Sequence, residues 1–199
     1  MKMALKLLSR IVKISLLLLI INGCTVKHRI ELEGCPKNFN FSSEERLKNY
    51  PFNNSENIVF ISYTQKQPGL IGTELSKYLS KLYKKTKKFE PEDVNEAYYL
   101  GKEDINELTD VFYNYGYNKG NITVSSSGCY MPKNAILFLD SEDYLSDYIE
   151  ICFECGVVKF SNEKMNLGYN CSDKLGLIKK LFEKYNIKYL KLEDQRSTN

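Results

Sequence analysis

Apolar residues recur at intervals of three and four, the spacing of one helix face, in three stretches of the chain. The clearest is residues 73–86, where leucines line one side and lysines the other. The second is residues 105–115, and the last is residues 172–185, with a serine at its N-terminus. Ser42 and Glu45 also fit a capping box at the start of a short helix. We therefore predict three principal helices preceded by a short one.

The lysines of residues 73–86 allow two interpretations. A basic amphipathic helix can lie on an anionic membrane surface. Alternatively, the leucines face a protein core while the lysines face solvent. We favour the second interpretation, because acidic residues follow directly in the sequence and can neutralise the lysines.

Four stretches rich in β-branched and aromatic residues predict strands. They are residues 57–63, 97–100, 134–140 and 148–155. The last extends through Phe160, and the third and fourth are close enough to form an antiparallel hairpin around residues 141–147. Helices and strands are interspersed without the regular alternation of a doubly wound sheet. We therefore predict an α+β fold, an antiparallel sheet with a C-terminal β-hairpin and about three helices packed on one face.

The first 23 residues have the pattern of a secretory signal peptide. Four basic residues precede an apolar run at residues 14–21, far shorter than the roughly 20 apolar residues that cross a bilayer. The run ends in Ile-Asn-Gly-Cys at residues 21–24, which resembles the lipobox of bacterial lipoproteins. There the chain is cut before a cysteine that is acylated. We expect residues 1–23 to be the signal peptide and Cys24 to carry lipid such as palmitate.

The rest of the chain divides into three parts. Residues 24–41 show no sustained period and predict a tether behind the lipidated cysteine. Residues 42–193 are expected to form a single globular α+β domain, and residues 194–199 a frayed polar tail.

Charge and histidine content exclude several classes of function. The chain has 28 basic and 25 acidic residues, and without residues 1–23 it keeps 24 basic and 25 acidic ones. The excess of positive charge thus belongs to the signal peptide and gives no reason to expect a nucleic-acid partner. His28 is the one histidine, and it lies four residues past the expected lipid site at Cys24. This excludes a histidine-based catalytic triad and a multi-histidine metal site.

The cysteines carry the clearest candidate chemistry. In an extended strand, Cys152 and Cys155 are about 10 Å apart at about 3.3 Å per residue, whereas a disulfide needs Cα atoms within about 7 Å. We therefore expect each to bond elsewhere, either as 129–152 with 155–171 or as 129–155 with 152–171. Cys35 is then left over in the tether, either as a free thiol or in a strained partnership, and Glu150 and Glu154 form a solvated strand face.

Two alternatives to structural disulfides stay open. Cys152 and Cys155 have the spacing of half a zinc knuckle, and Cys129 and Cys171 can complete a four-sulfur zinc site in space. Redox catalysis is the other alternative, although a reactive pair normally sits at a helix N-terminus.

Three motifs lie in the C-terminal part of the chain. They are Cys-Tyr-x-Pro-Lys-Asn-Ala-Ile-x-Phe-x-Asp at residues 129–140, Tyr-Ile-x-Ile-Cys-Phe-x-Cys at residues 148–155 and Cys-x-Asp-Lys at residues 171–174. Together they resemble a family of exported bacterial proteins of unknown activity. The resemblance implies that the hairpin and its cysteines form one unit, and it carries over no catalytic role.

These observations lead to one main hypothesis. We expect a lipoprotein, held by lipid on Cys24 on a bacterial membrane, with the outer membrane and its periplasmic or outer surface favoured. Its domain is expected to be a cysteine-stabilised binding or structural module of the cell envelope, without a cofactor and not an enzyme. Its partners are the membrane and an unknown envelope protein or ligand. The alternative is a metal-binding or thiol-dependent protein that uses Cys129, Cys152, Cys155 and Cys171, with zinc as the metal.

Overall fold

The computed structural model describes residues 34–63, 74–84, 87–118 and 130–188. All of them belong to one compact unit, Leu32–Asn199. The predicted signal peptide, Cys24, Cys129 and the polar tail lie outside the described residues. Within the described ranges, no helix is long and apolar enough to cross a membrane.

A five-stranded antiparallel sheet forms the centre of the fold, in the order β2-β1-β3-β4-β5. Its strands are β1 (Asn57–Ser62), β2 (Glu96–Tyr99), β3 (Asn134–Leu139), β4 (Leu145–Cys152) and β5 (Val157–Phe160). The sequence prediction of the first three strands and of the β3–β4 hairpin is confirmed. Every residue of β3 is buried, which indicates that both faces of the sheet are covered.

The described residues form four α-helices beside the sheet, and the α+β class predicted from the sequence is confirmed. They are α2 (Ser43–Leu47), α3 (Glu74–Tyr83), α4 (Lys102–Asn114) and α5 (Lys174–Lys184), with short 3-10 turns at Phe52–Asn54 and Pro91–Asp93. The predicted capping box at α2 is present, with Ser42 and Glu45 bonded in both directions.

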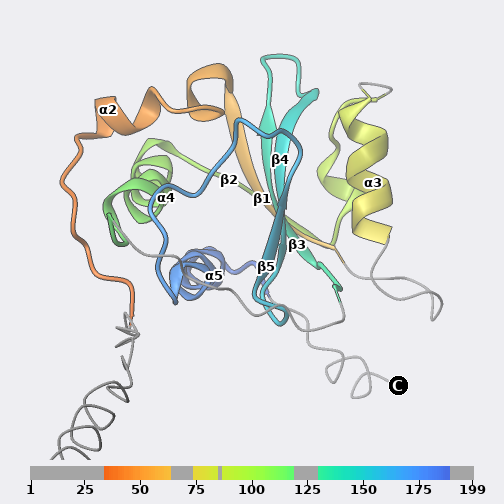
Figure 1. Cartoon of the computed structure of the whole chain (residues 1–199). Helices are drawn as coiled ribbons and strands as arrows, with labels where there is room; N and C mark the ends of the chain where they lie inside the picture. The colour runs from red at the N-terminus through yellow and green to blue at the C-terminus, as the bar shows by residue number, and fades with distance from the viewer. Residues whose placement is uncertain (1–33, 64–73, 85–86, 119–129, 189–199) are drawn as a thin grey trace, which may run out of the picture. The chain divides into compact units, whose positions relative to one another are not determined.

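The prediction that the helices pack on one face is wrong. Helix α3 covers one face of the sheet, and α4 and α5 cover the other (Figure 1). Strand β1 shows the reason, because Ile58 and Phe60 face α4 and α5 whereas Val59 and Ile61 face α3. Each face is apolar, so each must be buried by a helix.

The leucine side of α3 packs against the sheet, as predicted. Leu75, Leu79 and Leu82 are buried in the smaller core cluster, with Leu137 of β3 among their neighbours. The lysines of α3 are exposed. In the larger cluster, on the opposite face, Phe60 stacks on Phe182 of α5 with ring centroids 4.1 Å apart.

The predicted strand through residues 148–160 is wrong in its second half. Strand β4 ends at Cys152, residues 153–156 form a turn, and β5 runs back along β4 with Cys152 opposite Val157. Gly156 has a φ of +66°, a backbone conformation that glycine adopts without strain. The turn brings Cys152 and Cys155 together.

Residues 34–41, predicted as part of the tether, instead lie along the domain, and we call them the strap. Cys35 forms a disulfide with Cys171, so of the two states expected from the sequence the free thiol is wrong. The backbone N–H of Phe39 donates to the carbonyl oxygen of Asn114 at 3.1 Å, and that of Phe41 donates to the Asn114 side chain at 2.8 Å. Hydrogen bonds therefore hold the strap at the C-terminal end of α4, and the disulfide holds it to the loop before α5.

Candidate functional site

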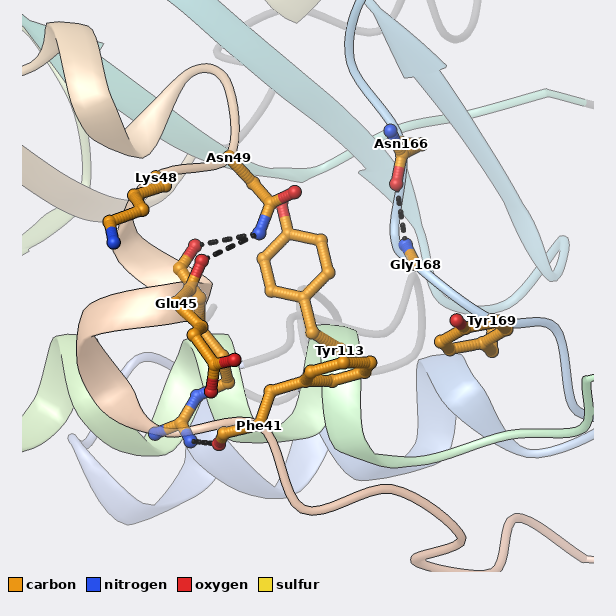
Figure 2. Close-up of a pocket in the computed structure, with 9 residues that line it drawn as sticks. Phe41, Glu45, Lys48, Asn49, Tyr113, Asn166, Gly168 and Tyr169 are labelled. Atoms are coloured by element: carbon orange, nitrogen blue, oxygen red, sulfur yellow. Dashed lines mark hydrogen bonds between the residues drawn. The ribbon is translucent and has the colours of Figure 1, made fainter.

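A pocket of about 560 Å³ opens between α2, the end of the strap, α4 and the loop before α5 (Figure 2). Its lining residues are Phe41, Glu45, Arg46, Lys48, Asn49, Tyr113, Asn166, Gly168 and Tyr169. This volume lies within the range of about 300–1,000 Å³ that small-molecule sites usually occupy.

One side of the pocket is a flat aromatic surface made by Phe41 and Tyr169, which we call the aromatic shelf. Their rings are nearly parallel, 6° apart, with centroids separated by 6.4 Å. Phe39 stacks on Tyr169 at 3.8 Å and supports the shelf from the strap. Phe41 keeps 37% of its surface exposed, so the shelf offers an apolar face to a ligand.

Tyr113 stands above the shelf and carries a buried hydroxyl without a partner. The residue is only 6% exposed, and among the residues that the structure describes its hydroxyl oxygen has neither solvent contact nor a hydrogen-bond partner. Burial raises the pKa of this phenol well above its ordinary value, so the group is neutral. Figure 2 shows the ring upright, with its hydroxyl end pointing away from the ring of Phe41. An unpaired buried hydroxyl costs about 1–3 kcal/mol, which a bound hydrogen-bonding group would offset.

The acidic residue of the pocket already has partners. The backbone N–H and the hydroxyl of Ser42 each donate to the Glu45 carboxylate at 2.8 Å. These bonds hold the pKa of Glu45 below its usual value. The carboxylate therefore completes the capping box at the N-terminus of α2, where Ser42 is the cap residue.

The two cations of the pocket are also paired. Arg46 is 5% exposed and donates to the carbonyl of Phe41, to Asn106 and to Thr109. Lys48 forms an exposed ion pair with Glu44 at 3.3 Å. Among the charged side chains that line the pocket, as the structure describes them, each is thus already engaged within the protein.

Two neutral amides complete the rim. The Asn49 amide nitrogen donates to the carbonyls of Glu45 and Arg46, which leaves its oxygen as an acceptor. The Asn166 oxygen accepts from the N–H of Gly168 at 2.8 Å, which leaves its amide nitrogen as a donor. The pocket therefore offers apolar rings and neutral hydrogen-bonding groups.

Gly168 fixes how closely the loop before α5 approaches α4. Its φ is +71°, and a β-carbon there would lie 2.2 Å from the carbonyl oxygen of Phe112. Only glycine allows this contact without a shift of the backbone. The contact places the neighbouring Tyr169 at the shelf.

The cysteines predicted as a cluster are instead separated into two disulfides. Cys152 bonds to Cys155, and Cys171 bonds to Cys35, so both pairings expected from the sequence are wrong. The turn after Cys152 is the physical reason, because it reduces the Cα separation of Cys152 and Cys155 to 5.2 Å. Cys129 lies outside the described residues.

The zinc alternative loses its ligands in this arrangement. A disulfide-bonded sulfur has no thiolate to offer, and three of the four predicted ligands are bonded in this way. In the part of the chain that the structure describes, no group of three or more cysteine, histidine, aspartate or glutamate side chains is arranged to hold a metal.

The Cys152–Cys155 turn is buried. Cys152 is 2% exposed and Cys155 6%. The N–H of Cys155 donates to the Cys152 sulfur at 3.2 Å, and the N–H of Met131 donates to the Cys155 sulfur at 3.5 Å.

The solvated strand face predicted for Glu150 and Glu154 is wrong at Glu150. This residue of β4 is 2% exposed and accepts a hydrogen bond from Ser76 of α3.

Sequence reasoning did not find the aromatic pocket. Phe41, Tyr113 and Tyr169 are far apart along the chain, and residues 24–41 have the irregular pattern of a tether. The one available signal was composition, with 15 tyrosines and 10 phenylalanines but no tryptophan.

No protein-family model, curated protein or solved structure matches this chain. The resemblance noted for residues 129–174 therefore stays a prediction.

Proposed function

We propose that this chain is an exported lipoprotein, anchored through lipid on Cys24, whose domain binds a small ligand in the pocket beside the aromatic shelf. The anchor would place the domain on a bacterial membrane, with the outer membrane favoured. The observation that carries the binding role is the combination of the shelf with the unpartnered hydroxyl of Tyr113.

Export is supported by two independent features. The signal-peptide and lipobox pattern of residues 1–24 is one. The other is the presence of two disulfides, since structural disulfides persist in oxidising compartments outside the cytosol.

Binding without catalysis is supported by the state of the titratable groups at the pocket. Catalytic acids and bases are usually held near the pH at which they act. The Glu45 carboxyl instead has a lowered pKa and caps a helix, and Arg46 is saturated with acceptors. The groups left for a ligand are neutral, which suits recognition.

A fragment screen tests the proposed binding role. We would titrate mixtures of small neutral and charged compounds into the full chain in detergent and follow the tyrosine ring signals by NMR. Shifts confined to Tyr113 and Tyr169, and lost in Tyr169→Ala, are expected. The control is Tyr99→Ala, which removes an exposed ring on β2. A screen in which no compound shifts the pocket tyrosines contradicts the proposal.

A thiol-dependent function is the second candidate, and the Cys152–Cys155 disulfide favours it. Two N–H groups directed at the sulfurs would stabilise a thiolate after reduction by a partner dithiol, which would itself become a disulfide. The burial of both sulfurs weighs against it, since exchange requires access to a sulfur. Equilibration with a dithiol buffer tests it: rapid, reversible reduction of this pair in the folded protein supports the candidate, and reduction only on unfolding excludes it.

A further inference from the structure

We infer that the ligand of this pocket is a neutral saccharide unit, an inference that rests on the binding role proposed above. It follows from three properties of the lining: a flat aromatic surface, neutral hydrogen-bonding groups around it and charged side chains that are already paired.

The aromatic shelf suits the apolar face of a sugar ring. Aromatic rings carry negative charge on their faces, which attracts the polarised C–H groups on one side of a pyranose. The rings of Phe41 and Tyr169 are parallel to within 6°, so they present one continuous surface wider than a single ring. Stacking on this surface leaves the hydroxyl groups of the sugar directed outward around its edge.

The groups around the shelf can meet those hydroxyls. The Tyr113 hydroxyl is both a donor and an acceptor, and within the described structure it has no partner. Asn49 offers an amide oxygen and Asn166 an amide nitrogen. An apolar aromatic ligand would leave all three groups unpaired, whereas a hydroxyl-rich ring can satisfy them. The Tyr113 hydroxyl has no solvent contact in the described structure, so a side chain of the pocket wall must shift before a ligand reaches it.

The state of the charged side chains argues against an anionic ligand. The Glu45 carboxylate accepts two bonds from Ser42, and Arg46 is bonded to backbone and side-chain oxygens of the strap and α4. A phosphate or carboxylate ligand would therefore find only Lys48, which is exposed and paired with Glu44. Exposed ion pairs contribute little, so one such lysine gives no strong preference for an anion.

Calorimetric titration of the full chain in a sugar-free zwitterionic detergent tests the inference. The neutral probes are maltotriose, cellotriose and tri-N-acetylchitotriose. The charged probes are chitotriose, a cation, and trigalacturonate, an anion. We expect at least one neutral trisaccharide to bind with a millimolar or lower dissociation constant and to exceed both charged probes in affinity.

Two variants locate the binding. Tyr169→Ala should weaken it by about tenfold or more because the shelf loses a ring. Tyr113→Phe should weaken it by about tenfold while leaving thermal stability unchanged or slightly raised, because it removes an unpaired hydroxyl from the unliganded protein. A structural role for the hydroxyl would lower stability instead. Tyr99→Phe is the matched control and should change neither property.

Several outcomes overturn the inference. Tighter binding of trigalacturonate or chitotriose than of every neutral probe would show that charge governs the site. Saccharide affinity that survives Tyr169→Ala would place the binding elsewhere. If fragments shift Tyr113 and Tyr169 but no trisaccharide binds, the pocket is a ligand site for another class of compound. If neither fragments nor saccharides bind, the proposed function fails with the inference.

Discussion

The ammonium nitrogen of Lys174 lies 2.6 Å from the carbonyl oxygen of Tyr115, one residue beyond the end of α4. It also donates to the carbonyls of Val111 and Phe112, each at 2.9 Å. The first residue of α5 thus closes the C-terminal end of another helix, where unpaired carbonyls and the helix dipole both favour a cation. This contact fixes α4, which carries Tyr113, against the loop that carries Tyr169.

Replacing Lys174 with methionine should lower the free energy of unfolding by about 2–4 kcal/mol, because three carbonyls lose their donor in a buried place. Burial lowers the pKa of Lys174 to about 8, from 10.5. Between these two values the unfolded state binds more protons, so this lysine makes stability rise with pH there. Urea unfolding from pH 7 to 10 should show that the free energy of unfolding rises with pH in the wild type. This rise should be absent in Lys174→Met. Lys180→Met, at an exposed site on the same helix, is the control.

Glu150→Gln should leave the protein at least as stable as the wild type at pH 7. Burial raises the pKa of this carboxyl, so the folded state binds more protons than the unfolded state above pH 4.5. The free energy of unfolding that Glu150 contributes therefore falls as the pH rises above 4.5. Urea unfolding between pH 4 and 8 should show this loss in the wild type and in the control Glu154→Gln, but not in Glu150→Gln. An unchanged pH dependence in Glu150→Gln would contradict the assignment.

The two disulfides should differ in their effect on stability. Cys35–Cys171 closes a loop across a sequence separation of 136, whereas Cys152–Cys155 spans 3. The chain-entropy model gives about 5 kcal/mol for the long loop and about 2 kcal/mol for the short one. Urea unfolding of the two double serine variants should follow this order. Peptide mapping without reductant should recover the 35–171 and 152–155 links, and any other pairing would contradict the structure.

Gly168→Ala should destabilise the protein by at least about 2 kcal/mol and disturb the aromatic shelf. The matched control is Gly34→Ala, because Gly34 also has a positive φ, +78°, but nothing lies within 4 Å of its β-carbon position. The difference between the two variants isolates the clash with the carbonyl of Phe112. Equal losses, measured by thermal unfolding, would show that the clash is relieved by movement of the loop.

Cys24→Ser should abolish labelling of the protein by a palmitate analogue and release it from membranes. The expectation rests on the Ile-Asn-Gly-Cys sequence, since acyl chains on that cysteine would supply the anchor. Labelling followed by membrane fractionation checks it. A variant that still takes up label and sediments with membranes would show that another residue is modified.

Much of the fold could be predicted because local signals agree with it. Ser42 and Glu45 carry the capping box, and the leucine spacing of α3 matches the face that it buries. The burial of both sheet faces was also visible in principle. The run from Ile58 to Ile61 is apolar at every position, which is typical of a strand covered on both sides, and it was interpreted only as a strand.

The cysteine pairing and the pocket could not be predicted by the same means. Residues 148–160 have the composition of one long strand, and before Gly156 no turn residue marks the reversal after Cys152. The shelf depends on contacts between the strap and the loop before α5. A disulfide joins these two segments, and a backbone bond joins the strap to Asn114 of α4. Such long-range contacts leave no periodic trace in the sequence.

The Cys35–Cys171 bond also determines how the domain responds to a pulling force. Tension arriving along the chain before Cys35 passes through the bond to Cys171 and the start of α5. The hydrogen bonds between the strap and Asn114 therefore cannot be unzipped one after another from that end. Fully extended, the residues between the two cysteines would span on the order of 450 Å, at about 3.3 Å per residue. Because the disulfide closes this loop, a force on the N-terminal chain cannot extend it. The aromatic shelf lies inside that shielded loop, so its geometry is insulated from mechanical load on the N-terminal chain.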